Sequence, residues 1–163
     1  MKKTAIIMGS DSDLKVVEKA IEVFRQFEAP FEVHVYSAHR TPAELQAFVR
    51  GARENGFGVL IAAAGMAAHL AGAVAAATTL PVIGIPVKSA CFDGMDALLS
   101  TVMMPPGIPV ASVGVDGAKN AALLALEMLA IEDEALALKL AQNRAQTAES
   151  VLAKDAAVSK KYQ

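Results

Sequence analysis

The sequence predicts one α/β domain with a parallel β-sheet that is covered by helices on both faces. Along its 163 residues, short apolar runs alternate with longer stretches of helical pattern. Most of the short runs are apolar at every position, as strands buried on both faces must be. No Gly, Ser or Pro-rich linker and no shift in composition interrupts residues 1–163, so they are expected to form a single domain.

Five runs are expected to be strands, because they are short and rich in apolar, mostly β-branched residues. In chain order they are residues 4–8, 31–36, 58–62, 81–85 and 109–115. Helices are expected between and after them at residues 12–27, 42–55, 67–77, 95–102 and 118–130, and a further helix follows at about 132–157. Strands that alternate with helices in this way are typical of a parallel sheet.

The end signals are clearest for the second helix. Thr41 stands at the N-cap, Pro42 at the first helical position and Glu44 in the first turn, and Gly56 is expected to stop the helix. The third helix is apolar almost all round, so we expect it to be buried.

The last helix has no strand after it. Acidic residues open it at 132–134 and lysines end it, which suits the helix macrodipole. It is amphipathic only in part, through Leu136, Leu140 and Val151. Two arrangements are open: the helix extends from the body to embrace a neighbouring subunit, or it packs on its own domain.

The composition points to assembly and excludes several partners. Hydrophobic residues make up 54 % of the chain and 33 residues are alanine, more apolar surface than one small domain buries, so we expect a homo-oligomer. The net charge is −2 and the basic residues are scattered, which argues against nucleic acid and anionic membranes as partners. No uninterrupted apolar run approaches the length of about 18 residues that a membrane span needs.

Cysteine usage and the first residues indicate the compartment. Cys91 is the single cysteine, which excludes an intramolecular disulfide and a multi-cysteine metal site. The N-terminal residues have the pattern of a strand instead of a signal peptide. We therefore expect the protein to be located in the cytoplasm.

Ligands of a parallel α/β sheet bind beyond the carboxyl ends of its strands. The loop after the first strand begins with Gly9 and Ser10 and continues through Ser12 and Asp13 into a helix, an arrangement that suits a phosphate. The same residues are also ordinary helix caps, and neither a Walker A nor a GxGxxG pattern is present. Because a carboxylate repels phosphate, Asp13 is expected to accept a hydrogen bond from a neutral donor such as a sugar hydroxyl.

The loop after the second strand contains Ser37, Ala38, His39 and Arg40. Histidine is the side chain that titrates near neutrality when unperturbed, and arginine binds phosphate oxygens through a bidentate fork. The alternative is that His39 is a plain surface residue and that Arg40 pairs with Glu44.

The remaining candidates carry less chemistry. His69, in the apolar loop after the third strand, is either a ligand contact or a core histidine, and its apolar neighbours favour the core. His34 alternates with Val33 and Val35, so it is expected to face away from them in a structural role. The three histidines have no metal-ligand spacing, so no metal is expected. Cys91 lacks a nearby catalytic partner and is expected to be inert.

Two functions common among flavodoxin-like domains fit poorly. A phosphoacceptor receiver needs an aspartate at the end of the third strand, where this chain has Ala62, Ala63, Ala64 and Gly65. A flavin site would want aromatic side chains in its loops, and the second and third loops have none.

Six segments together resemble the N5-carboxyaminoimidazole ribonucleotide mutase family (PurE, class I) over about residues 4–130. They are IIMGSDSD (6–13), SAHRTP (37–42), AAGMAAHLAG (63–72), LPVIGIPV (80–87), GMDALLS (94–100) and MPPGIPVAS (104–112). The resemblance implies a flavodoxin-like three-layer sandwich with a five-stranded parallel sheet, assembled as an octamer. The final helix matches only in character.

The resemblance also implies the reaction. The family moves a carboxyl group from the exocyclic nitrogen of N5-carboxyaminoimidazole ribonucleotide to carbon 4 of the ring, in purine (IMP) biosynthesis, without ATP, metal or organic cofactor. The histidine at the place of His39 is the family's general acid and base, and one imidazole is chemically able to make both proton transfers. An apolar third loop disfavours the carboxylate and is suited to hold CO2 beside the ring.

Carried over by position, the resemblance assigns the substrate contacts. Ser10, Ser37 and Arg40 correspond to phosphate ligands and Asp13 to the partner of the ribose hydroxyls, while Ser12, Ala38, Gly65 and Ala67 line the site. Arginine at position 40 is typical of the mutase, whereas the branch that carboxylates aminoimidazole ribonucleotide with CO2 typically carries lysine. Met66, Ala71 and Met103 depart from the usual glycine, proline and glutamine. That carboxylase and a non-catalytic nucleotide-binding module are the alternative functions.

Overall fold

The computed structural model describes residues 1–162 and contains one five-stranded, all-parallel sheet. Its order is β2-β1-β3-β4-β5, so β3 is the central strand and lies between β1 and β4. The strands are β1 (Lys3–Met8), β2 (Phe31–Val35), β3 (Phe57–Gly65), β4 (Val82–Val87) and β5 (Ala111–Ser112). The predicted parallel sheet is confirmed.

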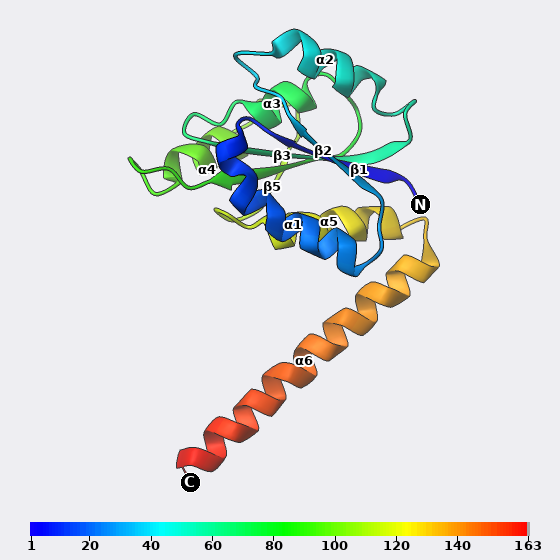
Figure 1. Ribbon diagram of the computed structural model, residues 1–163, viewed down its shortest axis with the longest axis vertical. Coiled ribbons are helices and arrows are strands. Elements are labelled where there is room, and N and C mark those ends of the chain that lie inside the picture. The colour runs from blue at the N-terminus through cyan, green and yellow to red at the C-terminus, as the bar shows by residue number, and fades with distance from the viewer. Residues whose placement is uncertain (163) are drawn as a thin grey trace.

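Helices cover both faces and make three layers, as predicted (Figure 1). One face packs against α1 (Leu14–Gln26) and α5 (Ala118–Ala130), around buried residues such as Phe24 and Leu126. The other packs against α2 (Pro42–Gly51) and α3 (Leu70–Ala75), around residues such as Leu45 and Val74. α4 (Met95–Val102) lies over β4, and the predicted bounds of α4 and α5 are those observed.

The fifth strand is much shorter than the predicted run of residues 109–115. Ala111 and Ser112 are paired in register with β4, and Val113 N adds one further bond to Gly84 O at 3.2 Å. Pro109 has no backbone N–H to donate to a ladder, and regular pairing stops before Asp116, whose left-handed φ of 55° does not fit a strand although its N–H still donates to Pro86 O of β4. The apolar pattern therefore overestimated the paired length.

Three helices of the body depart from their predicted ends, and the last helix, predicted at about 132–157, spans Glu134–Tyr162. A short 3-10 turn, η1 (Asp11–Asp13), precedes α1. α2 ends at Gly51, five residues before the predicted stop at Gly56, which lies in the turn before β3 with a φ of 83°. α3 begins only at Leu70, because Met66 adopts a left-handed φ of 54° and the following residues form a turn.

The last helix, α6 (Glu134–Tyr162), has 29 residues and projects away from the body of the molecule (Figure 1). Leu136, near its start, is buried, and Lys139 and Arg144 form ion pairs with Glu28 and Glu127. Beyond its first turns α6 extends from the body and does not pack along its own domain, and the embrace of a neighbouring subunit stays a prediction. Within residues 1–162 no helix is both long enough and apolar enough to span a membrane.

Candidate functional site

A cavity of about 610 Å³ opens at the carboxyl end of the sheet, among the loops that follow β1, β2, β3 and β4. This is where the parallel topology predicts a ligand. The nine residues that the resemblance assigns to catalysis or substrate contact all line it: Ser10, Ser12, Asp13, Ser37, Ala38, His39, Arg40, Gly65 and Ala67. Its other lining residues are Gly9, Ala64, Met66, His69, Leu70, Lys88 and Ser89.

The loop after β1 is held by its own serine. Ser10 Oγ accepts a hydrogen bond from Ser12 N at 3.3 Å and lies 3.2 Å from Asp11 Oδ1, to which it donates. Gly9 N donates to Ala63 O at 3.1 Å and so ties the loop to β3. Ser10 is thus a helix cap and at the same time part of the cavity wall.

Among residues 1–162, Asp13 is the only carboxylate that lines the cavity, and it is buried, with 8 % of its surface exposed. Burial raises the pKa of Asp13 above its ordinary value, and a 3.4 Å hydrogen bond from Ser12 Oγ opposes that rise. A buried carboxylate that faces a cavity is stabilised when a ligand donates a hydrogen bond to it. A hydroxyl group is such a donor, and it brings no charge.

We expect Asp13→Asn to raise the stability of the free protein at pH 7.5. The raised pKa means that the folded chain binds a proton at Asp13 more tightly than the unfolded chain does. Proton binding at Asp13 therefore stabilises the folded state. This contribution is full below pH 3.8 and is lost as the pH rises through the pKa of Asp13 in the folded chain. At neutral pH the charged side chain therefore costs stability, and neutral asparagine removes that cost. Urea unfolding should show a gain in Asp13→Asn that shrinks as the pH is lowered. A variant less stable than the parent at pH 7.5 would contradict this account.

The loop after β2 is organised by the hydroxyl of Ser37. Ser37 Oγ accepts hydrogen bonds from His39 N at 3.4 Å, from Arg40 N at 3.1 Å and from Arg40 Nε at 3.4 Å. Thr41, at the N-cap position, makes no side-chain cap; its Oγ1 instead accepts from Ser37 N at 2.8 Å and donates to Ser37 O. The loop is therefore bonded within itself and presents His39 and Arg40 to the cavity.

Arg40 turns toward the first loop, away from the alternative partner Glu44. Its Nη2 donates to Gly9 O at 3.3 Å. Across residues 1–162 no carboxylate lies within ion-pair distance of this guanidinium. An unneutralised guanidinium beside two serine hydroxyls is a favourable environment for an anion.

His39 and His69 are hydrogen-bonded to each other. His39 Nε2 lies 2.8 Å from His69 Nδ1, and the rings meet edge to face, 5.0 Å between centroids. The favoured interpretation of His69 as a core histidine is wrong: Ala68 is buried and His69 is exposed to the cavity. When both rings are neutral, one nitrogen of this bond carries the hydrogen and the other accepts it.

The other singled-out residues lie outside the cavity. His34 packs against Tyr36 and Phe48, with ring centroids 5.5 and 4.4 Å away, in agreement with a structural role. Cys91 is exposed in the loop between β4 and α4. In the described part of the chain, no three His, Cys, Asp or Glu side chains are grouped to hold a metal ion.

Sequence reasoning missed Lys88 and Ser89 as lining residues. They follow the last residue of β4, which places them at the same sheet edge as the other loops. That position was the available signal, because β4 neighbours β3 in the sheet.

Comparison with known proteins places these features in a family. The family model described as AIR carboxylase matches residues 3–150. A Pyrococcus abyssi protein named N5-carboxyaminoimidazole ribonucleotide mutase is 57 % identical over 144 residues, which cover 88 % of this chain and 83 % of the relative. A Methanocaldococcus jannaschii protein of the same name is 52 % identical and covers 96 % of this chain and 98 % of its own.

A solved structure, described as PurE of Treponema denticola, superimposes with a TM-score of 0.85 at 27 % sequence identity. The superposition covers 94 % of this chain and 96 % of that one. Sequence and fold thus agree over most of the chain's length. The chain belongs to the AIR carboxylase family, in which its near relatives carry the name of the N5-carboxyaminoimidazole ribonucleotide mutase.

Proposed function

We propose that this chain is an N5-carboxyaminoimidazole ribonucleotide mutase, a single-domain isomerase of purine biosynthesis that uses no metal or organic cofactor. The observation that carries the proposal is the His39–His69 pair, set in one cavity with an unpaired guanidinium and a buried carboxylate. The names of the similar proteins point to the same reaction.

The phosphate of the ribonucleotide is assigned to the end of the cavity formed by the first two loops. Ser10, Ser37 and Arg40 meet there, and Arg40 Nη2 already contacts the first loop through Gly9 O. A phosphate would find the hydroxyl hydrogen of Ser37, that of Ser10 once it leaves Asp11 Oδ1, and a cation that has no competing carboxylate. Asp13, buried beside this end, accepts hydrogen bonds from the ribose hydroxyls.

His39 is assigned the proton transfers. As the bond between the exocyclic nitrogen and the carboxyl carbon breaks, CO2 leaves and the nitrogen takes a proton from the His39 imidazolium. Carbon 4 of the ring then attacks CO2, and the proton that carbon 4 loses returns to His39. Protons and electron pairs balance over the two steps, so the His39 side chain ends the cycle as the imidazolium with which it began.

His69 is a positioning residue in this scheme. Its ring holds His39 Nε2 at 2.8 Å and fixes the direction of the imidazole in the cavity. Ala64, Gly65, Met66 and Ala67 of the third loop bring no charge to the same space. An uncharged wall of this kind keeps the released CO2 near the imidazole ring of the nucleotide.

The direct test measures turnover with two substrate sets. Synthetic N5-carboxyaminoimidazole ribonucleotide, without ATP or added bicarbonate, should be converted to 4-carboxy-5-aminoimidazole ribonucleotide, which is followed by absorbance. Aminoimidazole ribonucleotide with bicarbonate is run in parallel. Reaction only in the second assay would identify the CO2-dependent carboxylase, and binding without reaction in either would identify a non-catalytic nucleotide-binding module.

We further propose that the chain works in the cytoplasm as a homo-oligomer, an octamer by resemblance, without nucleic acid or membrane as a partner. The surface offers two apolar areas that support assembly. Beside the cavity, large side chains at the α4 end of the molecule are more than 45 % exposed, namely Met66, Phe92, Met95, Leu99, Val102 and Met103. The second area lies along α6.

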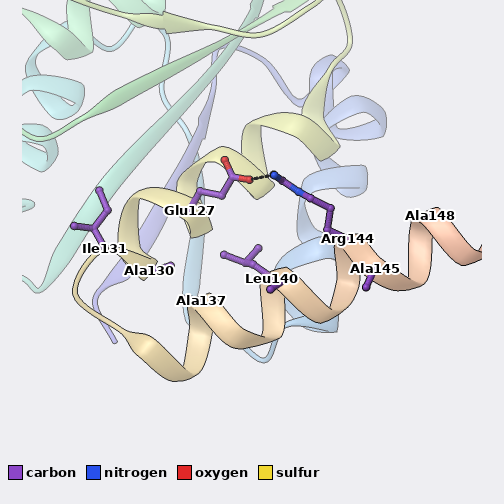
Figure 2. A pocket seen from close by; sticks show the side chains of 9 residues that line it. Glu127, Ala130, Ile131, Ala137, Leu140, Arg144, Ala145 and Ala148 are labelled. Carbon is purple, nitrogen blue, oxygen red and sulfur yellow. Dashed lines mark hydrogen bonds and ion pairs between the residues drawn. The ribbon is translucent and has the colours of Figure 1, made fainter.

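The α6 area includes a groove between α5 and the first half of α6 (Figure 2). Ile131, 83 % exposed, and Leu140 lie along it. The Glu127–Arg144 ion pair joins α5 to α6 at this groove. Farther along, Val151, Leu152 and Val158 are exposed on a helix that has left the body. A neighbouring subunit would cover these side chains.

Sedimentation at micromolar concentration should therefore give a mass far above that of one 16.9 kDa chain. Eight chains of 16.9 kDa amount to about 135 kDa. Removal of residues 146–163 should lower the mass of the assembly, because most of the exposed apolar side chains of α6 lie there. A full-length chain that sediments near 17 kDa would contradict the proposal.

A further inference from the structure

The wall of the cavity includes a second basic residue, Lys88, to which the scheme above gives no function. Lys88 lines the cavity, and apart from Arg40 it is the only lining residue with a permanent positive charge at neutral pH. Neither its ion pair nor its backbone bonds involve the histidines. Lys88 therefore lies outside the hydrogen-bonded group that contains the two histidines.

Sheet topology places Arg40 and Lys88 at opposite ends of the cavity. Arg40 follows β2 and Lys88 follows β4, and β1 and β3 lie between these strands. With neighbouring strands about 4.8 Å apart, β2 and β4 are separated by roughly 14 Å. The loop after β3, which carries His69, lies between the two cations.

The backbone of Lys88 is fixed while its side chain is free to move. Lys88 N donates to Asp116 Oδ1 at 2.9 Å, and Asp116 N donates to Pro86 O at 2.9 Å, so the start of the loop is tied to β4. The ammonium lies 3.0 Å from Asp93 Oδ1, with both side chains more than half exposed. An exposed pair of this kind is weak, so an anion in the cavity can compete for the lysine.

We propose that Lys88 forms a carboxylate subsite, binding the carboxyl group of the ribonucleotide at the end of the cavity opposite the phosphate. This inference rests on the proposed function, because only a ligand with two separated anionic groups would engage both cations. The ammonium leaves Asp93, which does not line the cavity, for the carboxylate of the ligand. Lys88 thereby distinguishes carboxylated from uncarboxylated nucleotides.

The test compares two ligands that differ by the carboxyl group. Calorimetric titrations use 4-carboxy-5-aminoimidazole ribonucleotide and aminoimidazole ribonucleotide on the intact assembly. In Lys88→Gln the Kd for the carboxylated ligand should rise about ten-fold, and the Kd for the other should stay within about two-fold, since a charged hydrogen bond has been lost in one complex only. Equal weakening of both ligands, or of neither, would overturn the subsite.

Two further variants test whether the effect is specific to Lys88 and its partner Asp93. Lys19→Gln, at an exposed position in α1 that does not line the cavity, should change neither Kd. Asp93→Asn should tighten binding of the carboxylated ligand, because the competing carboxylate is gone while asparagine tolerates the φ of 53° at this position. Weaker binding in Asp93→Asn would also count against the subsite.

The outcome is separable from that of the proposed function. Failure of the mutase reaction appears as absence of turnover by the parent protein. Failure of the subsite appears as loss of carboxylate discrimination in the titrations, which need no turnover.

Discussion

His39→Asn is expected to lower kcat by about 10²- to 10⁴-fold while the protein still binds the ribonucleotide. Asparagine keeps a polar side chain next to His69 but has no group that takes up and returns a proton near neutral pH. The phosphate and ribose contacts come from other residues, so KM should change far less than kcat. Steady-state kinetics with synthetic N5-carboxyaminoimidazole ribonucleotide, with a parallel titration of aminoimidazole ribonucleotide, measure both effects.

A matched control separates this effect from the loss of any histidine. His34→Asn changes a residue that packs against Tyr36 and Phe48 outside the cavity, and it should keep most of the activity of the folded enzyme. His69→Asn should lower kcat less than His39→Asn and should alter the pH profile, because the partner of His39 Nε2 changes. If His39→Asn turns over at the parental rate, the assignment of His39 is wrong.

Gly84→Ala is expected to cause the largest loss of stability among single-methyl additions to the sheet, about 1–3 kcal/mol. A Cβ at Gly84, in the buried strand β4, would overlap Thr101 Cγ2 and come within 3.3 Å of Ala71 Cβ. Thr101 has little freedom to rotate, because it is buried and its Oγ1 donates to Ala97 O at 2.7 Å. Against a total stability of about 5–15 kcal/mol this is a large fraction, measurable by urea unfolding.

The overlap itself is testable with a second substitution. Thr101→Ser removes the Cγ2 methyl and keeps the hydroxyl that bonds Ala97 O, so Gly84→Ala should cost much less in that background. Gly114→Ala is the matched control, since no atom lies within 4 Å of a Cβ built there, and it should change stability by well under 1 kcal/mol. An unchanged cost of Gly84→Ala in the Thr101→Ser background would show that steric overlap is not the cause.

The sequence predicted the strands and the loops of the site well because both depend on local pattern. Each buried strand is a continuous apolar run, and the residues just after a parallel strand lie at one sheet edge whatever the details of packing. That rule alone brings Ser10, Ser37 and Gly65 to the same place. Chain order and strand pattern are sufficient for it.

Other features depend on contacts between distant segments, which no local pattern contains. His69 meets His39 across β1, which separates β2 from β3, so neither segment by itself indicates the pairing. The late start of α3 follows from the left-handed backbone of Met66, a conformation that methionine rarely adopts. The extended course of α6 was one of two open arrangements, because its partial amphipathicity fits both.

The short strand β5 has a consequence for how this protein avoids aggregation. It is an edge of the sheet, and a long, flat edge with free N–H and C=O groups is a template on which another chain adds a strand. Here the regular strand is limited to Ala111 and Ser112, between Pro109 and the left-handed residue Asp116. Uncontrolled growth of sheets from one molecule to the next is thereby blocked on this side. The proposed assembly would then form through helices and side chains instead of through added strands.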